Sequence, residues 1–488
     1  MSASPHIQSA AKALLGLKTP APRKEAGVLY SPPARCVLSD EQEAFLALDA
    51  PRLVLTALAG CGKSRVLAEY ASRHSHRKWA YLAFNKRMAQ DASAMMPHVS
   101  CKTIHSLAFS AFGLPYQDKL DGIWASSALL ARAWPRPAQA PAALSRLLLG
   151  TVARFVASPD IALSPSHIPH GLWKEAATDH QGQSSTVVEA AYRLWEGMVD
   201  TGCALPMTLD GLVKLMQLAQ HNPFPSRSAA VLIDEAQDLT PCIRHWLDQL
   251  PHPTVRAGDP FQSIYGWRMH GMQQPWTVPG ETAGWLCGSW RFGPEVGTLV
   301  NPLLGALGSP HGLVGLAAPT CIDTRPSGEG VLLARTRLGL VSAAVRAITQ
   351  GAKLDLTAAP WLVAALEGKS MEDISPDWED ASTAWTKDAL LYAADLRKHQ
   401  SVGPGSLRVM TAHSSKGATF GRVQLAEDFS WPPEGTDDSA TENIRLLYVA
   451  LTRAQHHLVL PAPLLAALRS DPRTPAKSSA VVLGDDGF

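Results

Sequence analysis

A glycine-rich segment between an expected strand and an expected helix constrains this chain more than any other feature. It runs Ala57-Leu58-Ala59-Gly60-Cys61-Gly62-Lys63-Ser64, directly after the apolar residues 53–56. Glycines let backbone N–H groups approach phosphate oxygens closely, and the N-terminus of the following helix favours an anion. Ala57 stands where the usual pattern has its first glycine, so a strand-to-helix turn without a ligand remains an alternative. The segment predicts a phosphate-binding loop in an α/β fold.

The residue types of this loop fit nucleotide and metal chemistry. Lys63 is placed to reach the β- and γ-phosphates of a nucleotide, and Ser64 is placed to ligate Mg²⁺. We therefore expect ATP and Mg²⁺ as cofactors. The residues expected to bind ATP here are Ala59, Gly60, Cys61, Gly62, Lys63, Ser64 and Arg65.

A second element supports the first. Residues 231–238 form an apolar run that ends in carboxylates, and the end of a strand beside a phosphate loop is where a metal and a general base belong. Asp234 is expected to hold the metal, and Glu235 to orient or deprotonate the attacking water. The alternative interpretation is a solvated acidic turn.

Apolar runs and helical stretches alternate in two blocks, which is typical of parallel sheets covered by helices. Expected strands are residues 53–56, 79–84, 231–233 and 254–257 in the first block, and 331–334, 407–410 and 457–460 in the second. A Leu/Ala-rich, proline-broken segment predicts a helical insertion in the first block. A shorter insertion, with an acidic run over 372–380 that we interpret as a solvated loop, interrupts the second.

Composition excludes several classes of protein. Lys and Arg number 44 and Asp and Glu 43, so the net charge of +1 gives no polybasic arm, and a nucleic-acid site must be a local patch. The apolar stretches are too short or too proline-broken to span a bilayer. Seven cysteines without a CxxC pair favour a reducing compartment and no structural metal. We expect no secretion and a cytoplasmic or nuclear location, with a weak organellar signal left open.

Asp-Glu-Ala-Gln-Asp at 234–238 resembles motif II of the UvrD/Rep-like superfamily 1 DNA helicases. Other segments resemble further motifs of that family in the same order between Leu38 and about Leu460. They are residues 38–42 for the adenine-reading Q motif, 103–106 for motif Ib, 258–268 for motif III, 290–291 for motif IV, 410–417 for motif V and 445–454 for motif VI. Residues 83–86 and 206–215 are similar to the F-box DNA helicase branch, although the stretch before the Q motif is too short for an F-box.

The resemblance implies an α/β fold of two RecA-like P-loop NTPase domains, each with a mainly helical insertion. The implied division is a tail 1–37, domain 1A at 38–112 and 223–285, insertion 1B at 113–222, domain 2A at 286–353 and 402–470, a short insertion 2B at 354–401 and a tail 471–488.

The resemblance also implies roles for single residues. Gln42 would bind adenine, Gln262 would sense the γ-phosphate, and Arg291 and Arg453 would act as arginine fingers from a different sheet than Lys63. Gly417 and Thr419 would lie beside the nucleotide, with Thr419 replacing a glutamate that in the family hydrogen-bonds the ribose. The residues implied to contact DNA are Phe84, Asn85, Lys86, His105, Tyr265, Trp267, Arg268, Thr411 and His413. Trp267 as a core residue remains the alternative.

The function implied is an ATP-dependent helicase and translocase that moves 3′ to 5′ on single-stranded DNA and unwinds duplexes. Its partners would be single strands and single-strand/duplex junctions, bound without sequence preference, with no membrane. One alternative is a DNA-stimulated ATPase subunit that licenses a protein partner such as a nuclease. A P-loop metabolic kinase is the alternative from another class, and single-stranded DNA would not stimulate it.

Overall fold

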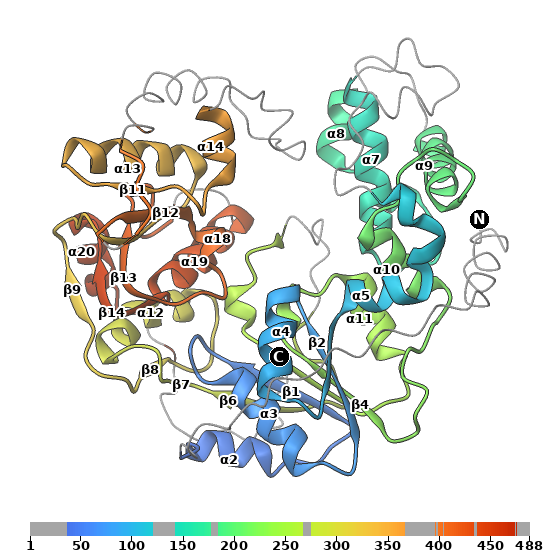
Figure 1. Ribbon diagram of the computed structural model, residues 1–488, viewed down its shortest axis with the longest axis horizontal. Coiled ribbons are helices and arrows are strands. Elements are labelled where there is room, and N and C mark those ends of the chain that lie inside the picture. The colour runs from blue at the N-terminus through green and yellow to red at the C-terminus, as the bar shows by residue number, and fades with distance from the viewer. Residues whose placement is uncertain are drawn as a thin grey trace.

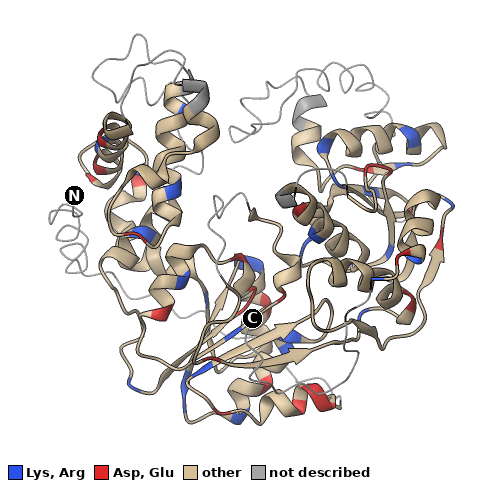
Figure 2. Cartoon of the chain, turned by 180° about the vertical axis from the view of Figure 1, so that it is seen from behind, with Lys and Arg blue, Asp and Glu red and all other residues tan. Residues whose placement is uncertain are grey.

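The computed structural model describes residues 37–120, 142–176, 184–266, 275–366, 396, 399–403, 405–433, 437–473 and 475. Figure 1 shows two α/β halves side by side, with a helical arm rising from the N-terminal half. In the described residues no helix is long and apolar enough to cross a membrane. Figure 2 shows acidic and basic residues interspersed along both halves, as a net charge of +1 leads one to expect.

The first half is built on a parallel six-stranded sheet with the order β3-β2-β4-β5-β1-β6. Its strands are β1 (Arg52–Ala57), β2 (Lys78–Ala83), β3 (Ser100–Thr103), β4 (Ala229–Ile233), β5 (Thr254–Gly258) and β6 (Thr282–Leu286). Its helices are α2 (Asp40–Leu46), α3 (Lys63–Arg73), α4 (Lys86–Met95), α5 (Ile104–Ala108) and α11 (Pro241–Asp248). The apolar runs predicted β1, β2, β4 and β5. The outer strands β3 and β6 were missed because exposed or half-exposed residues interrupt them.

The arm lies between β3 and β4 in the chain and consists of helices (Figure 1). These are α7 (Ala142–Ala157), α8 (His170–Ala176), α9 (Ser184–Val199) and α10 (Leu209–Leu218). Phe155 and Trp195 pack edge to face in a core that the arm shares with α5 and α11. The prediction that this insertion is mainly helical agrees with the described part of it.

The second half is built on another parallel sheet, with the order β11-β12-β10-β13-β14-β9. Its strands are β9 (Cys321–Asp323), β10 (Gly330–Ala334), β11 (Leu354–Asp355), β12 (Leu407–Thr411), β13 (Phe420–Leu425) and β14 (Ala454–Val459). Its helices are α12 (Pro294–Ala306), α13 (Arg337–Thr349), α14 (Pro360–Leu366), α18 (Ala412–Ser415), α19 (Asp437–Leu451) and α20 (Ala462–Ser470). The fold class expected from the sequence, two α/β halves with parallel sheets, is confirmed.

Two details of the second half differ from the sequence prediction. Residues 354–355 pair with β12, so the segment expected to be an insertion begins inside the sheet. A separate two-stranded sheet joins β7 (Gly288–Ser289) to β8 (Val314–Gly315), and Arg291 follows β7. Arg291 therefore follows a strand of this small sheet, whereas Arg453 lies between α19 and β14 of the six-stranded sheet. The acidic run 372–380 lies outside the described residues.

One apolar core joins the two halves. It extends from β1 and α3 through α12 and α19 to β13 and β14. The short helix at Pro260–Gln262, which follows β5, packs directly against α19. The carboxyl ends of β1, β4 and β5 therefore face a helix of the second half, and ligands of parallel sheets bind at such ends.

Candidate functional site

The phosphate loop connects β1 to α3 through two glycines that both adopt left-handed backbone conformations. The φ angles are +79° at Gly60 and +82° at Gly62, which side chains rarely permit. A Cβ on Gly60 would come within 2.7 Å of the Arg291 Cβ. The Trp290 N–H donates to the Gly60 carbonyl at 3.1 Å, so the loop touches the segment that carries Arg291.

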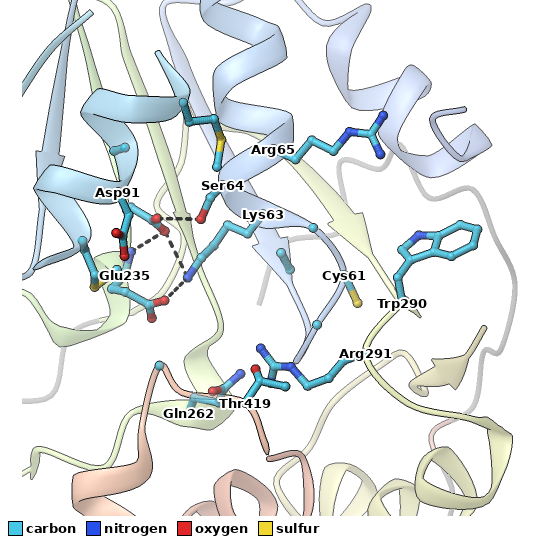
Figure 3. Close-up of a pocket in the computed structure, with 18 of the residues that line it drawn as sticks. Cys61, Lys63, Ser64, Arg65, Asp91, Glu235, Gln262, Trp290, Arg291 and Thr419 are labelled. Carbon is cyan, nitrogen blue, oxygen red and sulfur yellow. Dashed lines mark hydrogen bonds and ion pairs between the residues drawn. The ribbon is translucent and has the colours of Figure 1, made fainter. Parts of the chain in front are cut away.

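Lys63 contacts both carboxylates that directly follow β4, and Figure 3 shows it pointing toward Glu235. Its Nζ is 2.5 Å from Glu235 Oε1 and 3.1 Å from Asp234 Oδ1. Burial lowers the pKa of Lys63, but the two carboxylates outweigh burial and the net shift is upward. Burial raises the pKa of Glu235, but the positive charges of Lys63 and Lys416 outweigh burial and lower this pKa to about 2. Both side chains are thus charged at neutral pH.

Asp234 and Ser64 form the pair expected to hold a metal. Ser64 Oγ donates to Asp234 Oδ2 at 3.1 Å, and the Tyr81 hydroxyl donates to the same oxygen. In the described residues no group of three or more His, Cys, Asp or Glu side chains could hold a metal. Mg²⁺ commonly takes one or two protein oxygens and fills its remaining positions with phosphates and water. A hydroxyl and a carboxylate at the phosphate loop therefore fit Mg²⁺ held jointly with a nucleotide.

Glu235 is oriented from a second direction by Gln237. Gln237 Nε2 donates to Glu235 Oε2 at 2.5 Å, while Gln237 Oε1 accepts from the Asp259 N–H at 3.1 Å. Glu235 itself has a φ of +52°, a left-handed conformation uncommon for glutamate. The carboxylate at the end of β4 is therefore connected by hydrogen bonds to the end of β5.

Both predicted arginines reach the site from the far side. Arg453 follows α19 and is 1% exposed, and its Nη2 donates to Gln262 Oε1 at 2.9 Å. Arg291 Nη1 donates to the Thr452 carbonyl at 2.9 Å. Burial and the neighbouring Arg291 lower the pKa of Arg453, but a guanidinium stays protonated in proteins. Two fixed positive charges therefore face Lys63 across the cavity.

One cavity of about 520 Å³, a size suited to a small-molecule ligand, is lined by Lys63, Ser64, Asp234, Glu235, Gln262, Arg291 and Arg453. Figure 3 shows Lys63, Ser64 and Glu235 on one side, Gln262, Thr419 and Arg291 on another, and Arg65 with Trp290 at the remaining edge. Gly417 also lines the cavity. The Trp290 side chain is 54% exposed there and offers a flat aromatic face.

The Gln42 amide, predicted to bind adenine, is hydrogen-bonded within the protein. Its Nε2 donates to the Cys61 carbonyl at 3.1 Å, and its Oε1 accepts from the Ser39 N–H at 3.1 Å. The side chain is 2% exposed and is not among the residues that line the cavity. The reason is local, because the Ser39 capping box of α2 uses the same amide. Trp290, to which the sequence gave no base-binding role, is the residue at the cavity edge.

Three residues predicted to contact DNA come together from both halves. The rings of Phe84 and Tyr265 stack with centroids 5.7 Å apart and planes 9° apart. The His413 ring lies 6.4 Å from that of Tyr265, and burial lowers the pKa of His413. Phe84 and Tyr265 belong to the first half and His413 to the second, so this cluster crosses the boundary.

The remaining predicted DNA contacts have other environments. Asn85 Oδ1 accepts from the Met88 N–H and caps α4, and Thr411 caps α18 in the same way. His105 Nε2 is 2.8 Å from Asp210 Oδ1 on the helical arm. Lys86 is exposed. Trp267 and Arg268 lie outside the described residues.

Sequence reasoning missed residues that connect the halves. Lys416 Nζ lies 2.5 Å from Asp238 Oδ2, 2.7 Å from the Gln262 carbonyl and 4.8 Å from the Tyr265 ring centroid. Tyr448 contacts both the phosphate loop and Asp259. Each lies within a segment that resembles a helicase motif, but no pattern along the chain indicates which residue it contacts.

Two family matches agree with this architecture. An AAA domain matches residues 41–268, and a UvrD-like helicase C-terminal domain matches residues 406–460. Together these matches support a UvrD-like superfamily 1 helicase. Among relatives of this family, F-box DNA helicase 1 of Gallus gallus is 31% identical over 299 residues, which are 57% of this chain and 29% of the relative. F-box DNA helicase protein 1 of Schizosaccharomyces pombe is 27% identical over 489 residues, covering 84% of this chain and 55% of the relative.

The chain thus spans between about a third and about half of the length of these relatives. Among solved structures, the helicase of PRRSV matches with a TM-score of 0.35 and 12% identity, covering 90% of this chain and 58% of that chain. Arterivirus nonstructural protein 10 in complex with DNA matches with a TM-score of 0.34 and 12% identity, covering 88% and 65%. These scores are low, so the fold assignment depends on the two sheets themselves.

Proposed function

We propose that this chain is an ATP-dependent DNA helicase and translocase whose two halves hydrolyse ATP between them. The observation that carries the proposal is the shared cavity, where Lys63 of the first half faces Arg453 of the second. Neither half supplies both the phosphate loop and this guanidinium. Hydrolysis then requires both halves to be closed on one nucleotide, which couples chemistry to relative movement.

Each group has a proposed task in hydrolysis. Loop N–H groups other than that of Ala59 bind the β- and γ-phosphates together with Lys63. Asp234 and Ser64 would hold Mg²⁺, which would neutralise phosphate charge. Glu235 accepts the proton of the attacking water at a carboxylate oxygen. Gln262 contacts the γ-phosphate and so senses its presence. Arg291 and Arg453 stabilise the charge that develops on the transferred phosphoryl group; guanidinium groups in this role accelerate hydrolysis by about 10³–10⁵-fold.

Trp290 rather than Gln42 is the proposed base-binding residue. An indole half exposed at the cavity edge can stack on adenine, while the Gln42 amide is already bonded to Cys61 and Ser39. Thr419 lies at the cavity where the family usually has a ribose-binding glutamate.

Single-stranded DNA is the proposed track. Stacked aromatic side chains bind successive bases without reading sequence, and the Phe84, Tyr265 and His413 cluster provides such faces on both halves. The names of the two relatives support DNA as the substrate. The direction, 3′ to 5′, is proposed from the resemblance of the sequence motifs alone. The same resemblance supports the division into domains 1A, 1B, 2A and 2B, and a cytoplasmic or nuclear location.

The second candidate is an ATPase subunit that licenses a protein partner and unwinds little alone. The motif resemblance favours it because the insertion expected at 354–401 is short beside the regulatory domain that larger members of this family have there.

The deciding experiment measures ATP hydrolysis with and without single-stranded DNA, and strand displacement on duplexes with a 3′ or a 5′ overhang. Stimulated hydrolysis with displacement from the 3′ overhang is the expected result. Stimulated hydrolysis without displacement favours the licensing subunit. Hydrolysis indifferent to DNA contradicts both.

A further inference from the structure

Tyr448 of α19 is buried at the junction of the two halves and makes two hydrogen bonds across it. Its side chain is fully buried. The hydroxyl oxygen accepts from the Ala59 N–H of the phosphate loop at 3.0 Å, and the hydroxyl donates to Asp259 Oδ2 at 3.1 Å. These partners are 389 and 189 residues away in the sequence.

The Asp259 carboxylate links Tyr448 to Gln262 through hydrogen bonds. Asp259 is 1% exposed, and its Oδ2 accepts from Gln262 Nε2 at 2.6 Å while its Oδ1 accepts from the Phe261 N–H at 3.1 Å. Gln262 Oε1 in turn accepts from Arg453 Nη2 at 2.9 Å. Tyr448 and Arg453 lie at the same end of α19, five positions apart. A chain of hydrogen bonds therefore leaves α19 at the tyrosine, passes through the first half and returns at the arginine.

We propose that Tyr448 is a positioning residue that couples closure of the two halves to the phosphate loop and to Gln262. This inference rests on the proposed function, because it assigns a task within that same ATP site. When α19 docks, one hydroxyl satisfies the Ala59 N–H and fixes the carboxylate that holds Gln262. When α19 withdraws, both groups lose this partner together.

A purely structural role would need only the ring. The aromatic ring of Tyr448 fills the core between α19 and the phosphate loop, and phenylalanine would fill it equally well. The hydroxyl is the part that joins two groups, the Ala59 N–H and the Asp259 carboxylate, and a buried polar group left without its partner is costly. Tyr448→Phe therefore separates packing from positioning.

The test compares Tyr448→Phe with Tyr116→Phe. Tyr116 is also fully buried, and its hydroxyl donates to the Val199 carbonyl at 2.7 Å next to the helical arm, so this control loses a comparable bond far from the cavity. We expect Tyr448→Phe to lower the kcat of DNA-stimulated hydrolysis about tenfold while KM for ATP changes less than about threefold, because a bond made to a buried carboxylate on closure acts on turnover. In Tyr116→Phe both constants should stay within about twofold of wild type.

Two further measurements make the result specific. In a Gln262→Ala background, Tyr448→Phe should add less than about a twofold loss, since the residue through which it acts is gone. Hydrogen exchange of the peptide spanning residues 58–62 should be faster in Tyr448→Phe than in wild type, because the Ala59 N–H has lost its acceptor. Asp259→Asn, which leaves Tyr448 intact, should reproduce the loss of kcat if Tyr448→Phe folds poorly.

An unchanged kcat, a rise in KM alone, losses that multiply with Gln262→Ala, or unchanged exchange in the loop would each overturn the inference. A wild-type protein without ATP hydrolysis would instead contradict the proposed function. The exchange measurement still tests the contact in that case, so the two failures are distinguishable.

Discussion

Replacing Glu235 with glutamine removes one negative charge from the base of the cavity and keeps the shape of the side chain. Glu235 Oε1 lies 2.5 Å from Lys63 Nζ, and the second carboxyl oxygen accepts from Gln237. Since the pKa of Glu235 is lowered to about 2, the charge is present over the whole working range of pH. The glutamine variant should therefore separate nucleotide binding from hydrolysis.

The two effects have opposite signs. Two unit charges about 4 Å apart interact by about 4 kcal/mol at an effective dielectric constant of 20, and a triphosphate must take Lys63 away from this attraction to bind. Asp234 keeps a contact of 3.1 Å with Lys63, so only part of that energy is released. We expect ATP to bind about three- to tenfold more tightly to Glu235→Gln, or about 1 kcal/mol. Hydrolysis should fall by about 10²–10⁴-fold, because amides do not accept the proton of water.

The assay combines a titration with a fluorescent ATP analogue and steady-state phosphate release with saturating single-stranded DNA. Glu189→Gln serves as the control, because it removes the same charge from an exposed pair with Arg193 on the helical arm. That control should leave both measurements unchanged. A Glu235→Gln protein that hydrolyses ATP faster than about a tenth of the wild-type rate, or that binds ATP more weakly, would refute this reasoning.

Three further predictions concern pH, the arginine and the ribose. Burial raises the pKa values of Asp238 and Asp259 from 3.8 to about 6. Both carboxylates therefore become protonated in the folded protein as pH falls through 6, and Lys416 then loses the negative charge of Asp238. Their contribution to the free energy of unfolding increases as pH falls from about 6 to 4 and is lost as pH rises through 6. We therefore expect kcat to fall on acidification, while urea denaturation at pH 5 shows no loss of stability from these two groups. Asp238→Asn should make the fall of kcat at acidic pH shallower. Arg453→Ala should lower kcat by about 10³-fold or more with ATP affinity changed less than about tenfold, measured by the same titration and phosphate release; fast hydrolysis in this variant would remove the second half from the active site. Thr419→Glu should lower KM for ATP by about tenfold and increase rejection of 2′- and 3′-deoxy analogues, since a carboxylate bond to the ribose is worth about 1.5–3 kcal/mol, whereas DNA affinity should not change; a wild type that already rejects both analogues more than about tenfold would contradict this reading.

Local patterns predicted the central strands better than the outer ones. Buried apolar runs marked β1, β2, β4 and β5, and these four lie next to one another in the first sheet. Strand β13 was missed although it lies inside the second sheet, because exposed and half-exposed residues alternate with buried ones along Phe420–Leu425. Strand β11 was assigned to an insertion because only two residues form it. Short or half-exposed strands carry too few apolar residues to be distinguished from loops.

The sequence by itself determined the groups whose geometry is local. The conformation of a glycine-rich loop between β1 and α3, and the position of two carboxylates directly after β4, depend on neighbours in the chain, so Lys63, Asp234 and Glu235 could be identified as a set. The same local rule accounts for the environment of Gln42, because the capping box of α2 uses its amide.

Only the tertiary structure decided which distant residues meet. The contacts of Tyr448 with Ala59, of Arg453 with Gln262 and of Lys416 with Asp238 join residues 389, 191 and 178 positions apart. They exist because α19 and the loop after α18 dock against the ends of β1, β4 and β5, and docking depends on the packing of one core across both halves. No periodicity or spacing along the chain encodes that orientation. The sequence alone therefore does not indicate which residues Arg291 and Arg453 contact.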